Sequence, residues 1–264
     1  MLDERLKQLL CSSNEHNTNT LKRIIDGLPP QEQHELIHST DVDLRGWLHW
    51  CAIYRKDVPV ASVLRDFGAR LDTGDKDGRL PGHFAVLHEA EALLDYYSTI
   101  GKEYLDVPDN MGDTQLHLAA RQGNAGLGRK LLLNGADVDV RNTKTLDTAL
   151  HISVGKCDEA FIALLLEFGA STQIANNTGL LPSQLAVINT QSRIARMIDH
   201  PEAFGIRRPV VADPNANVRL HLNPGDSLFV KHQDGSSERL DHASDLTVVR
   251  RGIPPKVRRP RRIR

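Results

Sequence analysis

Four histidines recur at a constant interval of 34 residues along this chain. They are His49, His83, His117 and His151, and Gln184 follows at the corresponding place 33 residues later. A fixed period in this range is typical of repeat proteins, in which short structural units stack into a solenoid and each unit contacts only its neighbours. We therefore expect an elongated array that acts through its exposed surface, rather than a fold built around a deep catalytic pocket.

The residues just before these markers predict where helices begin. Thr114 and Thr148 precede a marker histidine by three residues, where a hydroxyl can accept a hydrogen bond from a free backbone N–H at a helix start. Pro81 and Pro182 follow the same position, and the fixed φ of proline suits the first turn of a helix. Each marker then falls at the third helical position, within reach of the turn that it caps, as in a capping box.

A second apolar run in each unit ends at a glycine. Glycine at the end of a helix is typical of a left-handed residue, which a side chain with a Cβ disfavours. One repeat is therefore predicted to consist of a turn, a helix, a short turn, a second helix and a loop. The four glycines that mark the ends of second helices are Gly68, Gly101, Gly135 and Gly169.

The third unit carries the most specific sequence signature. Residues 114–120 read TQLHLAA and residues 134–139 read NGADVD. They resemble the TPLHxAA and NGAxVN signatures of the ankyrin repeat family, and the resemblance covers five units over about residues 41–199. The first unit departs from the pattern with Gly46 and Trp47, and the second has Gly82 where leucine is usual. A tetratricopeptide array shares the period, but its Trp/Gly/Tyr spacing is absent here.

The regions outside the array differ from it in pattern. Residues 1–40 contain leucine and isoleucine stripes at helical spacing and are predicted to form a helical cap. Residues 200–249 contain alternating runs separated by turn residues, which predict a small antiparallel β extension, too small to be stable by itself. The predicted fold is thus mainly α, an ankyrin-like solenoid of about five repeats over 41–199 with these two additions and a basic tail at 250–264.

The charge of the chain is unevenly distributed. The net charge is −1, yet residues 250–264 contain eight basic residues and no acidic one, so the rest of the chain is acidic. An acidic body with a basic arm indicates an interaction segment. Lysine and arginine clusters can neutralise phosphate, and a nucleic-acid-associated role stays open. The tail has no aromatic residue to stack on bases, and it could equally bind an acidic patch on this array or on a partner.

Cysteine content and hydropathy restrict the compartment. The cysteines Cys11, Cys51 and Cys157 are odd in number and widely spaced, which favours a reducing compartment without structural disulfides. The N-terminus lacks the pattern of a signal peptide, and no stretch is long enough to span a bilayer. We expect a protein that is cytoplasmic, or delivered into the cytosol of another cell by a route that needs no signal peptide, without a membrane contact and without a cofactor.

One short motif suggests an enzyme. Residues 34–38 read HELIH, which fits the HExxH pattern in which two histidines on one helix face bind zinc and the glutamate acts as a base. His34, Glu35 and His38 would carry a metallopeptidase-like activity in this alternative. The residues typical of the extended zinc motif are absent downstream, where Asp41 and Leu44 stand. The other interpretation is a solvated helix with His38 near its C-terminus.

The resemblance to ankyrin arrays implies that the turn tips and the inner helices line a concave surface. Positions four and five after each marker then point into the groove. Tyr54 and Arg121 are of residue types common at binding hot spots. We predict a non-enzymatic adaptor or inhibitor that holds a protein partner on this surface, and possible edge pairing with the β extension offers a second contact. The candidate partner-binding residues are Tyr54, Arg79, His88, Asn110, Asp113, Arg121, Gln122, Lys156, Asn177 and Asn189.

Overall fold

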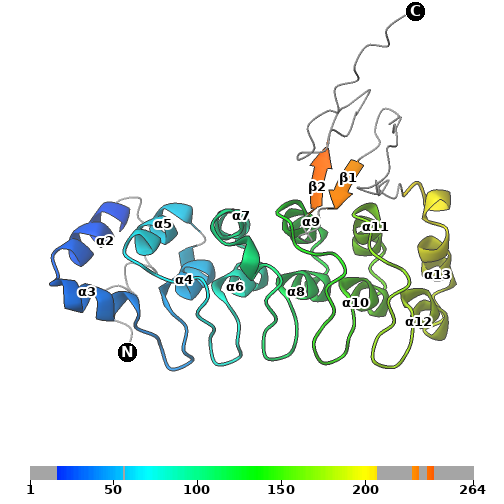
Figure 1. Cartoon of the computed structure of the whole chain (residues 1–264), viewed down its shortest axis with the longest axis horizontal. Helices are drawn as coiled ribbons and strands as arrows, with labels where there is room; N and C mark the ends of the chain where they lie inside the picture. The colour runs from blue at the N-terminus through cyan, green and yellow to red at the C-terminus, as the bar shows by residue number, and fades with distance from the viewer. Residues whose placement is uncertain (1–16, 56, 207–227, 232–236, 241–264) are drawn as a thin grey trace, which may run out of the picture.

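The computed structural model describes residues 17–55, 57–206, 228–231 and 237–240. Two rows of helices run side by side along the molecule, and extended turn tips project from the row of inner helices (Figure 1). The inner row comprises α4 (Trp47–Trp50) continued by the π-helix η1 (Cys51–Arg55), α6 (Pro81–Leu87), α8 (Gln115–Gln122), α10 (Ala149–Gly155) and α12 (Pro182–Ile188). The outer row comprises α5 (Val58–Asp66), α7 (Glu91–Ile100), α9 (Ala125–Leu133), α11 (Glu159–Glu167) and α13 (Ser192–Asp199).

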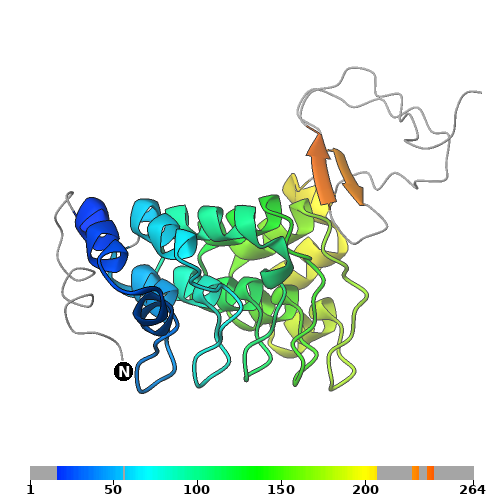
Figure 2. The same cartoon turned by 60° about the vertical axis from the view of Figure 1, so that its left-hand side comes forward.

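The two rows confirm the five predicted units and their order of turn, helix, turn and helix. Figure 2 shows, from a second side, that the helix pairs stack in register and that the tips all project in the same direction. No helix in the described residues is long and apolar enough to cross a membrane. A solenoid of this kind has no single central cavity, so its sites lie on the surfaces that the stacked units share.

The marker histidines form the predicted caps. In all four, ring Nδ1 accepts a hydrogen bond from the backbone N–H three residues earlier, at 3.0–3.2 Å. Nε2 therefore carries the proton. In three of the four it donates to a backbone carbonyl in the next tip, at 2.9–3.1 Å, and the pairs are His49 with Arg79, His117 with Asp147, and His151 with Leu180. Each of these rings thus joins two neighbouring units.

The threonines contribute differently from the prediction. The Thr114 hydroxyl donates to Nδ1 of His117 at 2.8 Å and makes no bond to a backbone N–H of its helix. Thr148 bonds to His151 in the same way at 3.0 Å. The histidine ring fills the space at the helix start, so the hydroxyl stabilises the ring. Pro81 and Pro182 begin their helices as expected.

Three of the four marker glycines are left-handed, with φ of 98° at Gly68, 100° at Gly135 and 83° at Gly169. The prediction is wrong for Gly101, whose φ is −161°. There is no room for a side chain at this position, because a Cβ would lie 2.5 Å from the ring of Tyr104. Tyr104 belongs to the 3-10 turn η2 (Lys102–Tyr104), which follows the second outer helix.

A ladder of backbone hydrogen bonds connects successive tips. Each tip donates one backbone N–H to a carbonyl of the tip before it, at 2.8–3.2 Å. This ladder fixes the spacing of the tips independently of their side chains. The donor and acceptor residues are Lys76 and Asp43, Asn110 and Asp77, Thr143 and Gly112, and Asn177 and Thr145.

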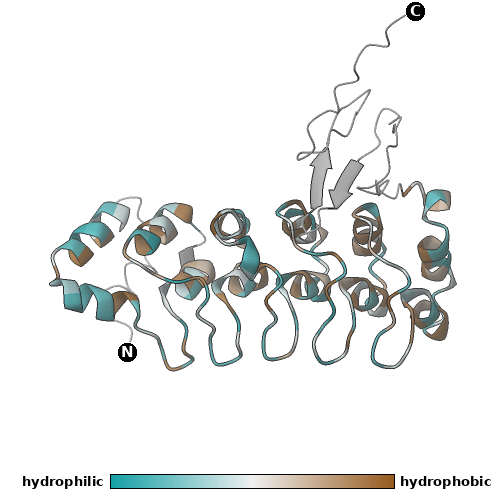
Figure 3. Ribbon diagram, in the orientation of Figure 1, coloured by the Kyte–Doolittle hydropathy of each residue, from teal (hydrophilic) through white to brown (hydrophobic). Residues whose placement is uncertain are grey.

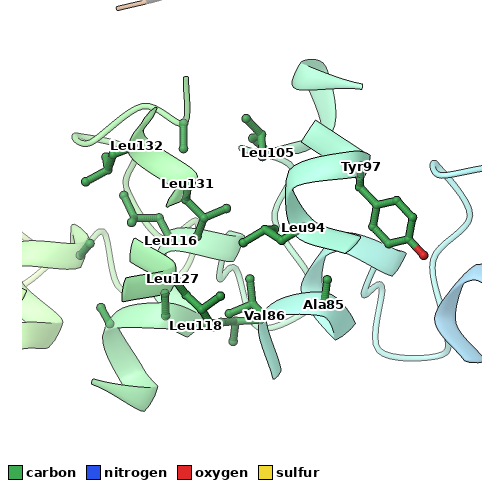
Figure 4. Close-up of a cluster of buried hydrophobic side chains, with 14 of the residues drawn as sticks. Ala85, Val86, Leu94, Tyr97, Leu105, Leu116, Leu118, Leu127, Leu131 and Leu132 are labelled. Carbon is green, nitrogen blue, oxygen red and sulfur yellow. The ribbon is translucent and has the colours of Figure 1, made fainter. Parts of the chain in front are cut away.

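The core is one continuous layer between the two rows. Leu94 of α7, Leu116 of α8, and Leu127 and Leu131 of α9 are buried and point toward one another (Figure 4). Tyr97 is buried as well, and its hydroxyl donates to the Leu48 carbonyl of the preceding unit at 3.0 Å. Burying apolar surface between neighbours is the main stabilising term in such an array.

Two helices precede the first unit, at the places that the leucine and isoleucine stripes indicate. They are α2 (Asn17–Asp26) and α3 (Pro30–Ile37). Leu21, Ile25 and Ile37 are buried against the first unit, while most other side chains of these helices face solvent. The stripe predicted within residues 1–16 lies outside the described residues.

The described residues do not support the predicted β-rich extension as a whole. Its first residues continue the last unit instead, because η3 (Pro201–Phe204) follows α13, with Pro201 buried and Phe204 packed against the core. Further along, β1 (Leu228–Lys231) and β2 (Ser237–Leu240) pair antiparallel, with Leu228 opposite Leu240. The other parts of the predicted extension between residues 207 and 249, and the tail at 250–264, lie outside the described residues.

Candidate functional site

A surface hollow of about 470 Å³ lies between the last three inner helices and their tips. Its walls combine basic, acidic, amide and apolar side chains. The lining residues are Arg121, Asp147, His151, Ile152, Gly155, Lys156, Asn176 and Leu185.

Arg121 is held in place by a buried carboxylate. Its Nε donates to Asp113 Oδ2 at 2.6 Å and its second amine to Oδ1 at 3.1 Å. Hydrogen bonding to Asp113 raises the pKa of Arg121, so the guanidinium stays charged. Asn142 Nδ2 donates to the same carboxylate at 2.6 Å. A paired guanidinium of this kind is already ordered before any partner arrives.

Asp113 therefore has a different role from the predicted one. Only 4% of the residue is exposed, so it cannot contact a partner directly. It acts through Arg121, whose side chain is half exposed. Tip position alone did not reveal this burial, because the partners Asn142 and Arg121 come from the next tip and from the end of an inner helix.

Lys156 is the freest charge around the hollow. It follows α10 as its C-cap residue and is exposed, and no hydrogen bond or ion pair of its side chain is present among the described residues. Asp147, across the hollow, accepts a hydrogen bond from Asn176 Nδ2 at 2.9 Å. The hollow thus offers an exposed positive charge at Lys156, a hydrogen-bonded positive charge at Arg121 and a hydrogen-bonded negative charge at Asp147.

Tyr54 lies apart from the hollow, in the first unit. Its ring stacks on Trp50 with centroids 4.9 Å apart, and 52% of the residue is exposed. The π-helix η1 carries it, and such irregular turns are frequent at functional positions. Trp50 is anchored in turn, because its ring N–H donates to Asp41 at 3.1 Å.

Of the other candidates of the second and third units, Arg79 and Gln122 connect neighbouring repeats, whereas His88 contacts a residue of its own helix. Arg79 pairs with the buried Asp109 at 3.5 Å. The His88 ring stacks on Phe84 at 6.1 Å. Gln122 Nε2 donates to the Leu87 carbonyl at 3.0 Å. These contacts use many of the polar groups that were predicted to bind a partner.

Asn110, Asn177 and Asn189 are all exposed. Asn110 and Asn177 lie at tips, where each donates its side-chain amide to a carbonyl of the preceding tip, at 3.1 and 3.4 Å. Asn189 ends α12. The structure therefore brings only Arg121 and Lys156, of the ten predicted residues, together around one hollow.

The apolar part of the hollow was absent from the predicted set. Ile152 and Leu185 stand one position after a marker residue, whereas the prediction considered the fourth and fifth positions. The corresponding Phe84 and Leu118 are buried, so the sequence pattern marked this position as core. Ile152 is buried as well, whereas Leu185 is half-buried, so mainly Leu185 adds apolar surface to the hollow.

The zinc alternative has a geometry that can be tested against known sites. The rings of His34 and His38 lie 4.3 Å apart, but α3 ends at Ile37 and His38 is its C-cap. The described residues contain no group of three or more His, Cys, Asp or Glu side chains that could share a metal. A catalytic zinc needs three protein ligands. Burial lowers the pKa of His38, and the charges of His34 and Arg70 lower it further.

The fold and surface define a class: a helical repeat protein whose tips and inner helices form a shared recognition surface. The family profile of ankyrin repeats in three copies matches residues 48–142 and 116–204. The chain therefore belongs to the ankyrin repeat family.

Several curated proteins are similar to this array. The NF-kappa-B inhibitor epsilon of Homo sapiens is 38% identical over 93 residues, which is 35% of this chain and 18% of that protein. The NF-kappa-B inhibitor cactus of Drosophila melanogaster is 30% identical over 107 residues, or 40% of this chain and 21% of that protein. The probable 26S proteasome regulatory subunit p28 of Saccharomyces cerevisiae is 29% identical over 138 residues, or 51% and 60%. The chain spans less than two thirds of each of these relatives.

Proposed function

We propose that this chain is an adaptor or inhibitor that holds one protein partner in the hollow of its last three repeats. Ankyrin repeats indicate a protein partner. The main support for this location of the binding site is the Arg121–Asp113 pair at the edge of the hollow, together with Lys156, whose side chain has no partner among the described residues. The names of the similar proteins, two inhibitors and a regulatory subunit, fit a role exerted through binding.

The lining favours a partner segment with an acidic group beside an apolar one. The carboxylate of such a segment can approach both Arg121 and Lys156, while the half-buried Leu185 covers its apolar side chain. Arg121 loses little rotamer freedom on binding because Asp113 already holds it. Preorganised arginines and buried apolar anchors supply most of the binding energy in interfaces of this size.

The proposal is tested by affinity capture with variants of the two basic residues and a matched control. The tagged chain is compared with Lys156→Glu and Arg121→Ala, and Lys102→Glu serves as the control because Lys102 is an exposed lysine after an outer helix. We expect the stoichiometric partner of the wild type to bind the first two variants at least about tenfold more weakly and the control unchanged. If all four proteins capture the same partner equally, the hollow is not the binding site.

A further inference from the structure

The last repeat leaves its stacking face uncovered. Val187 stands three residues after the marker position of its unit and is 63% exposed. The residues at the same position of the other four units are covered by the next repeat and have 0% exposure: Ala52, Val86, Ala120 and Val154. In Figure 3 this part of α12 shows hydrophobic residues at the very end of the array.

Two polar groups of the same face also lack the partner that their equivalents have. Gln184 Oε1 accepts from the Leu181 backbone N–H at 2.9 Å, as histidine Nδ1 does in the other units. Its Nε2 donor, which corresponds to the histidine Nε2–H, bonds to nothing in the described residues. The carbonyl of Thr178 stands at the ladder position of Asp43, Asp77 and Thr145, and it accepts no backbone bond there either.

The uncovered area is confined to the inner helix and its tip. The outer half of the same end is closed, because η3 follows α13 and Ile194 and Ile198 are buried. The opposite end of the array is closed as well by α2 and α3, which present polar side chains outward. A face that combines an apolar side chain, a donor and an acceptor is therefore open at one end only.

The chain itself contains a segment that needs such a face. Among the described residues, β1 and β2 pair with each other, and neither strand makes more than a weak contact with a helix. An isolated two-stranded hairpin is marginally stable in water. Its first strand reads Leu-Phe-Val-Lys, and 21 residues connect it to Ile206, which follows η3 in the outer half of the last repeat. A linker of that length can span at most about 70 Å, which is ample for the hairpin to reach α12.

We propose that the open face of the fifth repeat is the docking site of this chain's own hairpin, residues 228–240. The strand edge supplies backbone N–H and carbonyl groups to the Thr178 carbonyl and the Gln184 amide. The apolar residues of β1 cover Val187. The hairpin then acts as the terminal cap that a repeat array requires, in place of a sixth repeat.

A second copy of the chain is the alternative occupant. Stacking of one array on the next in the same direction is blocked, because α2 and α3 cover the other end. Only a symmetric pairing of two open faces stays available. Such a dimer would leave the hairpins free, so the two arrangements differ in which residues lie next to Val187.

A photoreactive benzophenone amino acid at position 187 of the full chain distinguishes the two. We expect an intramolecular crosslink to peptides within residues 228–240 and a monomer in sedimentation. The same probe at Met111, an exposed tip residue with 61% exposure, is the control and should not reach the hairpin. A crosslinked dimer joined through residue 187 would overturn the proposal in favour of the second copy, and failure to crosslink residues 228–240 would overturn it as well.

Hydrogen exchange gives a second and independent readout. Val187→Asp should accelerate amide exchange in residues 228–231 and 237–240 by about tenfold or more, because docking protects those amides. The array itself should stay folded, and its thermal stability should fall only by what the docked hairpin contributed as a cap. Val42→Asp, at 89% exposure in the first tip, should leave hairpin exchange as it is. Equal exchange in the wild type and Val187→Asp would contradict the docking.

Discussion

At the scale of single residues, the marker histidine is a neutral connector between units. His117 accepts from its own helix start and donates to the Asp147 carbonyl at 3.1 Å. Burial lowers its pKa from 6.5 more than these hydrogen bonds and the nearby aspartates raise it. The same direction holds for His49, His83 and His151. Protonation would put a second proton on Nδ1 and break the bond to the helix start.

A pH dependence of stability follows. Below pH 6.5 the unfolded chain binds protons at these histidines while the folded chain does not, so the free energy of unfolding falls as the pH decreases. His117→Gln should reduce that slope by up to about one proton between pH 5 and 7, because Gln184 shows that an amide can make the same cap bond. Urea unfolding at several pH values measures the slope.

His117→Leu is the companion variant. It removes the titrating group as well, so it should reduce the slope equally, but it leaves the Thr114 N–H without a partner. At pH 8 it should therefore be less stable than His117→Gln by about 1–3 kcal/mol. A slope that is the same in the wild type and both variants would refute the assignment of this pH dependence to His117.

At the scale of elements, the turn between the two helices of a unit has one backbone conformation. The residue six after each marker is left-handed in four units, with φ of 54° at Glu89, 73° at Gly123, 58° at Cys157 and 60° at Thr190. Glycine adopts this region without a steric penalty, whereas a β-branched residue is strained there. The turn geometry is thus imposed by helix packing, and only the third unit has the residue that suits it best.

Reciprocal substitutions test this conclusion. Thr190→Gly should stabilise the protein by about 0.5–1 kcal/mol, since relief of strain exceeds the entropy cost of glycine. Gly123→Thr should destabilise it by about 1–3 kcal/mol, because its Cβ would also lie 3.0 Å from Asp158. Thermal unfolding of both variants gives the answer, and two shifts of the same sign would show that the backbone conformation is not the cause.

At the scale of the whole molecule, stability depends on how closely neighbouring units approach. Gly128 on α9 lies against the next outer helix, where an added Cβ would be 2.6 Å from the Phe161 ring. Phe161 is fully buried, so it cannot move aside without opening the interface between the third and fourth units. In an array held by nearest-neighbour contacts, a weak interface separates the units on either side of it.

Two glycine-to-alanine changes separate packing from helix propensity. Gly128→Ala should lower stability by about 1–3 kcal/mol and broaden the unfolding transition. Gly155→Ala, where a Cβ meets nothing within 4 Å, should raise stability by up to about 0.5–1 kcal/mol, since alanine favours helix. Chemical denaturation followed by circular dichroism measures both. Equal effects of the two substitutions would mean that contact with Phe161 does not matter.

Much of the fold was predictable because the repeat period is a local signal. The markers, the turn prolines and the outer-helix glycines indicated five units and the starts of their helices. Gly101 was wrongly predicted to be left-handed, because glycine is needed there to avoid a contact with Tyr104 and not to adopt a positive φ. The candidate site was harder to predict, since Asp113 and Ile152 occupy positions whose exposure depends on the neighbouring unit.

The sequence by itself determined the family, the number of units and the side of each unit that carries a marker, because these follow from periodic residues and their local hydrogen bonds. Only the tertiary structure decided which side chains are available to a partner. The burial of a residue depends on whether another unit follows, so Val154 is covered while Val187 is exposed. Asp113 is buried and binds Arg121, so it is not available to a partner. In a stacked repeat protein the exposure of a side chain depends on the neighbouring repeats, so the sequence of one repeat does not determine it.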